Sequence, residues 1–139
     1  MVKTDYNYIV KADELMLGNW ITVNASADRK KDFVDKIIRL DESLFQEGRY
    51  FAIFVTPEIL IENGFKKRIA PLLENVEYRS EDNRVVITNG KDFQMDETIW
   101  YVHIDNSDMD SVGNGTFKYL HQLQNILTVN NYKQQFKLN

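Results

Sequence analysis

One stretch near the end of the chain constrains the fold most, residues 117–128, which read FKYLHQLQNILT. At about 100° per residue, five side chains fall on one broad apolar arc: Tyr119, Leu120, Leu123, Ile126 and Leu127. His121, Asn125 and Thr128 lie together on an adjacent face, and Gln124 lies at its border. The three hydrogen-bonding side chains at positions i, i+3 and i+4, His121, Gln124 and Asn125, are called the polar row below. The stretch therefore predicts an amphipathic helix that buries one face and carries the polar row along its side.

The residues in front of this helix are acidic and rich in glycine. Residues 105–114 read DNSDMDSVGN and predict an acidic loop. Gly113 and Gly115 are expected to interrupt the chain, and Asn114 or Thr116 can cap the helix. Gly113-x-Gly115-Thr116 lacks the lysine of a phosphate-binding loop, which favours a flexible turn.

Most of the remaining chain shows strand patterns. Alternating or β-branched segments predict strands at residues 20–23, 50–55, 76–80, 84–88 and 98–104, with short additional strands at 6–9 and 132–138. Residues 32–45 fit a helix and a strand–turn–strand unit equally well.

A second, shorter helix is predicted after the strand at 50–55. Thr56-Pro57-Glu58 is a typical helix start, and Asn63-Gly64 is a typical helix end. The basic cluster Lys66-Lys67-Arg68 is interpreted as favourable charge at the C-terminus of this helix.

Composition limits the possible classes of protein. The 139 residues are 43% hydrophobic, carry a net charge of −4 and include no cysteine. We expect a single domain over residues 1–139, in which residues 12–55 can form a β-rich subdomain and residues 56–139 an α+β part. The charge argues against nucleic-acid binding. The first residues lack the apolar core of a signal peptide, so we expect a cytoplasmic protein without a membrane segment.

Three segments together resemble a known group of proteins: LGNWITV (17–23), VTPEILIENGFKK (55–67) and YLHQLQNILT (119–128). The chain is similar to small uncharacterised proteins of gut anaerobes and their phages and mobile elements, with the pattern "LxxGNxV … LTEEWLLKFGF … YVHQLQNLYFALTG". The acidic loop and Thr128-Val129-Asn130 depart from this pattern. The group has no activity to carry over.

The resemblance implies a twisted β unit early in the chain, similar to a small barrel, with an α+β layer behind it. Residues 32–45 would then be strands. His121, Leu123, Gln124 and Asn125 stand at matching positions of the pattern, without an assigned role. The expected fold class is α+β: a small-barrel-like β unit followed by a mainly antiparallel sheet with two helices.

Two interpretations of the polar row differ in their consequences. In the functional one, His121, Gln124 and Asn125 form a binding surface, or a base with two amides beside it. In the structural one, they tie the helix to loop backbone where the β unit meets the sheet. We favour the structural interpretation, because a histidine without a nearby carboxylate or nucleophile is weak support for catalysis.

A metal site is a weaker candidate. His103, Asp105, Asp108 and Asp110 carry metal-binding groups, and Asn106-x-Asp108-x-Asp110 resembles the start of a calcium loop. Ser111 stands where that loop needs glycine and Phe117 where it needs glutamate, so the pattern fails. We expect no metal and no cofactor.

The favoured function is a non-enzymatic accessory module that binds an unidentified protein, in keeping with the resemblance to mobile-element proteins. One alternative is a small metal-dependent hydrolase that uses His103, His121 and the acidic loop. The other is a nucleic-acid-contacting protein with the barrel-like unit as its platform.

Overall fold

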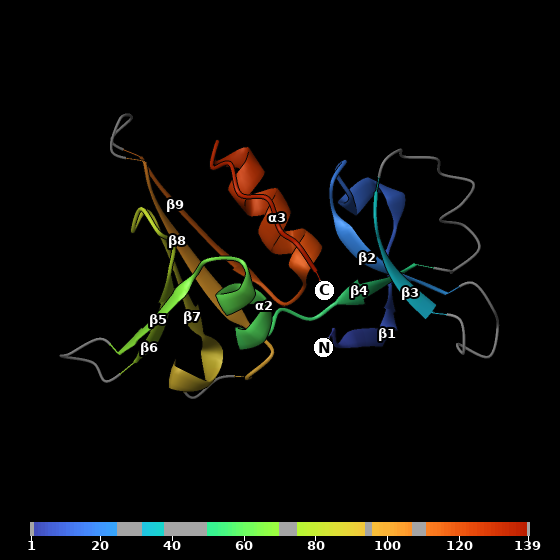
Figure 1. The fold of residues 1–139 in the computed structure, drawn as a ribbon, viewed down its shortest axis with the longest axis horizontal. Helices are drawn as coiled ribbons and strands as arrows, with labels where there is room; N and C mark the ends of the chain where they lie inside the picture. The colour runs from blue at the N-terminus through green and yellow to red at the C-terminus, as the bar shows by residue number, and fades with distance from the viewer. Residues whose placement is uncertain are drawn as a thin grey trace.

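The computed structural model describes residues 2–24, 32–37, 50–69, 75–93, 96–106 and 111–138. It is an α+β fold of two antiparallel sheets and two α-helices, as predicted (Figure 1). The longer helix, α3 (Leu120–Val129), lies between the two sheets in Figure 1. None of the helices in this described part has the length and apolar content needed to cross a bilayer.

The first sheet contains four strands in the order β1-β4-β2-β3. Their bounds are Thr4–Ile9 for β1, Trp20–Asn24 for β2, Asp32–Lys36 for β3 and Tyr50–Ile53 for β4. A short 3-10 helix, η1 (Ala12–Glu14), follows β1. Within the described residues β1 and β3 are the two edges and the sheet does not close, so the small barrel is not confirmed.

The second sheet is a run of five strands in chain order, β5-β6-β7-β8-β9. Their bounds are Lys66–Ile69, Val76–Arg79, Val85–Asn89, Trp100–Asn106 and Ser111–Phe117. A second 3-10 helix, η2 (Gly90–Phe93), follows β7. The inner face buries large side chains of alternating residues: Tyr78, Val85, Ile87, Trp100, Val102 and Ile104. Alternate side chains of these strands therefore point into the core.

Helix α3 packs its apolar face against the buried side chains of the second sheet. Leu120, Leu123 and Leu127 are buried, as the apolar arc predicts. The helix contacts β2 and β4 of the first sheet and β9 of the second. An isolated β-bridge between Phe54 and Tyr119 joins the end of β4 to the start of the helix.

The short helix α2 (Pro57–Glu62) forms as its sequence signals predict. The Thr56 hydroxyl accepts a hydrogen bond from the Ile59 N–H, and Pro57 occupies the first turn. Gly64 has a φ of 91°, the left-handed conformation that ends many helices.

Two predictions around the last helix are wrong. Gly115 and Thr116 belong to strand β9, which starts at Ser111, so the glycine-rich segment is not a turn before the helix. The helix begins only at Leu120, with Tyr119 as its N-cap, so neither Asn114 nor Thr116 caps it. The Gln122 side chain instead accepts hydrogen bonds from the backbone N–H groups of residues 118 and 119.

Other predictions have mixed outcomes. The basic cluster Lys66-Lys67-Arg68 is not at a helix C-terminus; it forms most of strand β5. Residues 132–138 form no strand, although Phe136 is buried in the core. Within residues 32–45, β3 agrees with the strand interpretation, and residues 38–45 lie outside the described part. The expected single domain stays a prediction.

Candidate functional site

The polar row of α3 faces one short segment, residues 14–20, which joins η1 to β2. Gln124 bonds the backbone of this segment twice. Its Oε1 accepts from the Trp20 N–H at 2.9 Å, and its Nε2 donates to the Gly18 carbonyl at 3.0 Å. The side chain therefore holds the start of β2 against the helix.

Asn125 binds the same segment through both ends of its amide. Its Nδ2 donates to the Glu14 carbonyl, and its Oδ1 accepts from Asn19 Nδ2, both at 2.9 Å. Asn19 is only 2% exposed, and its own Oδ1 accepts from the Met16 N–H at 2.7 Å. The two asparagines thus form one hydrogen-bonded unit that fixes the turn before β2.

His121 is completely buried and bonds a carboxylate. Its Nε2 lies 2.9 Å from Oε1 of Glu14, whose Oε2 accepts from the Tyr8 hydroxyl at 3.2 Å. Burial lowers the pKa of His121, and the nearby Glu14 opposes this shift. A neutral ring that donates from Nε2 leaves Nδ1 as an acceptor, and Nδ1 has no partner among the described residues.

Aromatic side chains extend this network to strand β1. The Tyr119 hydroxyl donates to Oδ2 of Asp5 at 2.6 Å, and the Tyr119 ring stacks on His121 with centroids 6.0 Å apart. Burial, with the Asp5 carboxylate as a second cause, raises the pKa of Tyr119. The network therefore connects β1, η1 and α3 and lies where the first sheet meets the helix.

These contacts include the hydrogen bonds to loop backbone that the structural interpretation predicts, so that interpretation is confirmed for Gln124 and Asn125. Glu14, Asn19 and Tyr8 were not among the candidate residues. The partners of Glu14 and Asn19 on α3 lie more than a hundred positions away in sequence, and no local spacing signals such a pairing. A role of the polar row in binding a partner stays a prediction.

The structure does not bring the two histidines together. His103 and Asp105 are exposed on β8, and they alternate with the buried Val102 and Ile104, so they lie on the face turned away from the core. His121 is inside the core. Asp108 and Asp110 fall outside the described residues. Within the described ranges, no group of three histidine or acidic side chains is arranged to hold a metal ion.

Comparison of the chain with models of protein families, with curated proteins and with solved structures finds no match.

Proposed function

We propose that the protein is a non-catalytic binding module that takes up an extended acidic segment of a partner protein along strand β5. The observation that carries this proposal is a basic edge made of Lys66, Lys67 and Arg68. In keeping with the resemblance to small mobile-element proteins, we place such a module among accessory proteins of the cytoplasm.

Strand β5 is exposed along its whole length. Among the described strands it pairs only with β6, and all four of its residues are exposed, with Ile69 at 65%. An edge strand presents unpaired backbone N–H and C=O groups to a further strand. Main-chain hydrogen bonds of this kind give affinity when an extended peptide joins a sheet, and the side chains give specificity.

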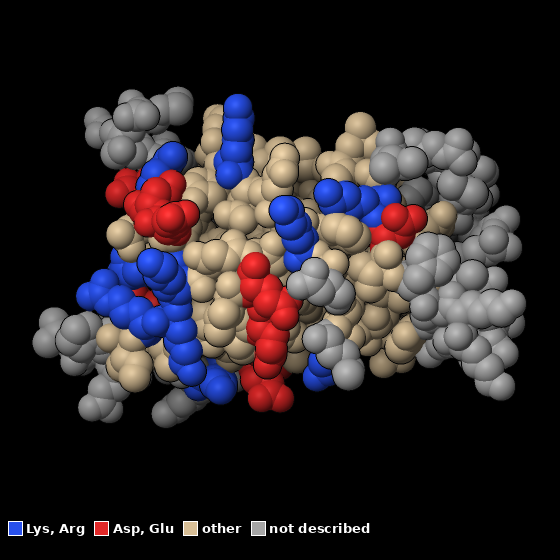
Figure 2. Space-filling model, viewed as in Figure 1, with Lys and Arg blue, Asp and Glu red and all other residues tan. Residues whose placement is uncertain are grey.

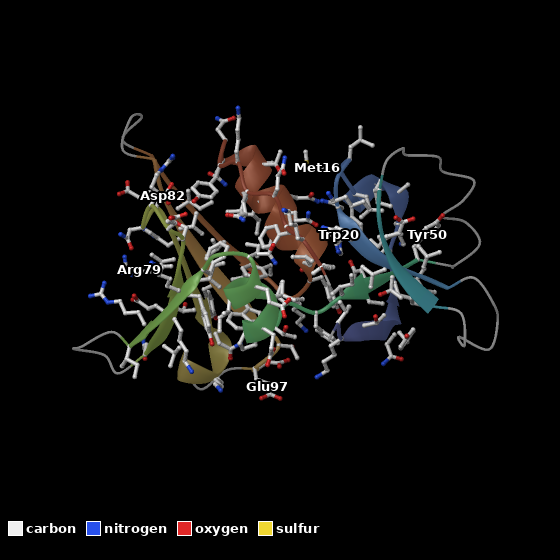
Figure 3. All side chains as sticks on the ribbon, in the orientation of Figure 1. Met16, Trp20, Tyr50, Arg79, Asp82 and Glu97 are labelled. Atoms are coloured by element: carbon white, nitrogen blue, oxygen red, sulfur yellow. The ribbon has the colours of Figure 1, made fainter. Side chains whose placement is uncertain are left out.

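The charge on the basic edge selects the partner. Arg79 on the neighbouring strand is already paired with Glu77, with Nε 2.9 Å from Oε2. Across the described part of the chain, no carboxylate forms an ion pair with the basic edge itself. Figure 2 shows lysine and arginine side chains gathered over β5 and β6, with acidic groups beyond them near Asp82, which Figure 3 labels.

Lysine on an edge strand also protects proteins from pairing with copies of themselves. Two basic edges would repel each other, because antiparallel pairing brings like charges together. An acidic strand is instead attracted to the basic edge, and it gains main-chain hydrogen bonds with β5 as well. The same three cations therefore reject a second copy and accept an acidic partner.

Fluorescence anisotropy with labelled peptides tests the proposal. The probes are an alternating Glu–Val peptide, its Lys–Val counterpart and a Glu–Val peptide interrupted by prolines. We expect only the uninterrupted acidic peptide to bind, more weakly at higher salt. Lys66→Glu combined with Arg68→Glu should weaken this binding at least about tenfold, which corresponds to about 1.4 kcal/mol.

The control is Lys133→Glu combined with Lys137→Glu, which makes the same change in net charge on two exposed side chains near the C-terminus. Equal effects of the two double variants would overturn the proposal. So would tighter binding of a single-stranded oligonucleotide than of the acidic peptide, which would indicate a nucleic-acid surface instead. Amide hydrogen exchange should slow at residues 66–69 on binding, and unchanged exchange there would contradict strand addition.

A further inference from the structure

A hollow of about 290 Å³ lies beside η2, between the segment that links β4 to α2 and the second sheet. Its walls come from the segment that links β4 to α2 and from strands β5 to β8, and they include Phe54, Lys67, Tyr78 and Trp100. Lys3, Lys91 and Glu97 complete it. Its volume is close to the lower limit of ligand sites, roughly 300–1,000 Å³.

The wall of the hollow is aromatic and held in place. Trp100 is 3% exposed, and its Nε1 donates to the Val55 carbonyl at 3.1 Å. The ring of Tyr78 meets that of Trp100 edge-on, with centroids 5.8 Å apart. Phe54 adds a third ring from the segment that links β4 to α2. Because hydrogen bonding and packing fix these rings, the apolar wall exists before any ligand arrives.

Three lysines and one carboxylate surround this apolar wall. Lys3, Lys67 and Lys91 come from three separate parts of the chain and are exposed, as is Glu97. No carboxylate of the described ranges forms an ion pair with any of these lysines. Lys3 Nζ lies 5.5 Å from the centroid of the Phe54 ring, a cation–π distance. The local charge is therefore positive on a protein whose net charge is negative.

We infer that this hollow binds a small organic anion that has one flat apolar part, such as an aryl phosphate or an aryl carboxylate. The apolar part packs against the partly exposed Phe54 ring and against the edges of Trp100 and Tyr78 that line the hollow. Because Trp100 is 3% and Tyr78 5% exposed, the surface removed from water is mainly that of Phe54 and of the ligand itself. The acidic group meets the lysines, and Glu97 can accept a hydrogen bond from a hydroxyl or amine of the same ligand.

This site is separate from the binding of an acidic peptide, although both include Lys67. Side chains alternate between the two faces of a strand, so Lys67 is directed to the hollow while Lys66 and Arg68 are directed to the opposite face. Lys66 and Arg68 do not line the hollow. Replacing Lys66 and Arg68 can therefore remove peptide binding and leave the hollow intact.

Isothermal titration calorimetry with phenyl phosphate and benzoate tests the inference. Both should bind, whereas inorganic phosphate and benzyl alcohol, which lack the ring and the charge respectively, should bind at least about tenfold more weakly. Lys67→Glu combined with Lys91→Glu should reduce binding of both anions by a similar factor. Lys66→Glu combined with Arg68→Glu is the matched control and should leave it unchanged.

Three results would overturn the inference. Failure of both anions to bind at about 10 mM would show that there is no site of useful affinity. Equal binding of inorganic phosphate would mean that the aromatic wall is not used, and equal binding of benzyl alcohol would mean that the lysines are not. If the acidic peptide fails to bind while phenyl phosphate binds as expected, the proposed function is wrong and the hollow remains a site.

Discussion

Removing the Asn125 side chain should destabilise the fold by an amount that can be worked out from its two bonds. Asn125→Ala leaves Asn19 Nδ2 and the Glu14 carbonyl without their partners. A buried group without a partner costs about 1–3 kcal/mol. Asn19 is almost fully buried, whereas the bond to the Glu14 carbonyl is only partly buried, so water can reach that end more easily. We expect a total loss of about 2–4 kcal/mol.

Equilibrium unfolding in urea measures this loss directly as a shift of the midpoint at constant slope. Thr128→Ala is the control, because Thr128 is exposed on the same helix and should change stability by less than about 0.5 kcal/mol. A double-mutant cycle with Asn19→Ala should give a coupling of about 0.5–3 kcal/mol, because the first substitution already removes the shared bond. A stability of Asn125→Ala within about 0.5 kcal/mol of the parent would show that the two bonds of Asn125 do not stabilise the fold.

Three further predictions concern the same helix. Leu123→Ala should cost about 2–5 kcal/mol in urea unfolding, because Leu123 is fully buried and leaves a cavity; a stable variant would show that the helix faces another way. Gly115→Ala should be at least about 0.5 kcal/mol less favourable in the parent than in an Ile126→Val background, because a Cβ there would lie 3.1 Å from Cδ1 of Ile126, which valine lacks; equal effects in the two backgrounds in urea unfolding would contradict this. Burial lowers the pKa of His121, so the unfolded chain binds more protons below about pH 6.5 and stability should fall as the pH drops through that region. His121→Gln removes this titration and should flatten the curve of urea midpoint against pH; an identical slope between about pH 7.5 and 5.5 would count against the assignment.

The sequence predicted the burial of α3 well and the place of His121 less well. The apolar arc has the helical period, so Leu120, Leu123 and Leu127 could be recognised as buried. A helical wheel assumes that a helix packs on one side. Because α3 packs between two sheets, the neighbouring face is covered as well, and His121 is buried together with the arc.

The prediction of a turn at Gly115 is wrong for a different physical reason. Gly115 was interpreted as a break in the chain, but it lies in the middle of a strand under Ile126 of α3. There the absence of a side chain allows the helix to approach the sheet closely. A short glycine-rich segment cannot show by itself whether glycine is needed for a turn or for close packing.

The basic edge shows how one element boundary changes an interpretation. Gly64 correctly marked the end of α2, but the lysines after it were still counted as charge on that helix. The structure assigns them to β5, where they are exposed along a strand instead of lying at a helix terminus. The hollow could not be predicted from the sequence, because its lysines come from parts of the chain that no local pattern connects.

The hydrogen bonds of the polar row also have a consequence for the order in which the protein can fold during synthesis. Trp20 and Gln124 are 104 positions apart, and Glu14 and Asn125 are 111 positions apart. During synthesis, the turn before β2 lacks its hydrogen-bond partners until α3 has been translated, about a hundred residues later. Contacts of such long range also slow folding, because the intervening chain must be ordered before they are gained. Nascent chains stalled before α3 should therefore be digested readily by protease at residues 14–20, and chains stalled after α3 has left the ribosome should resist.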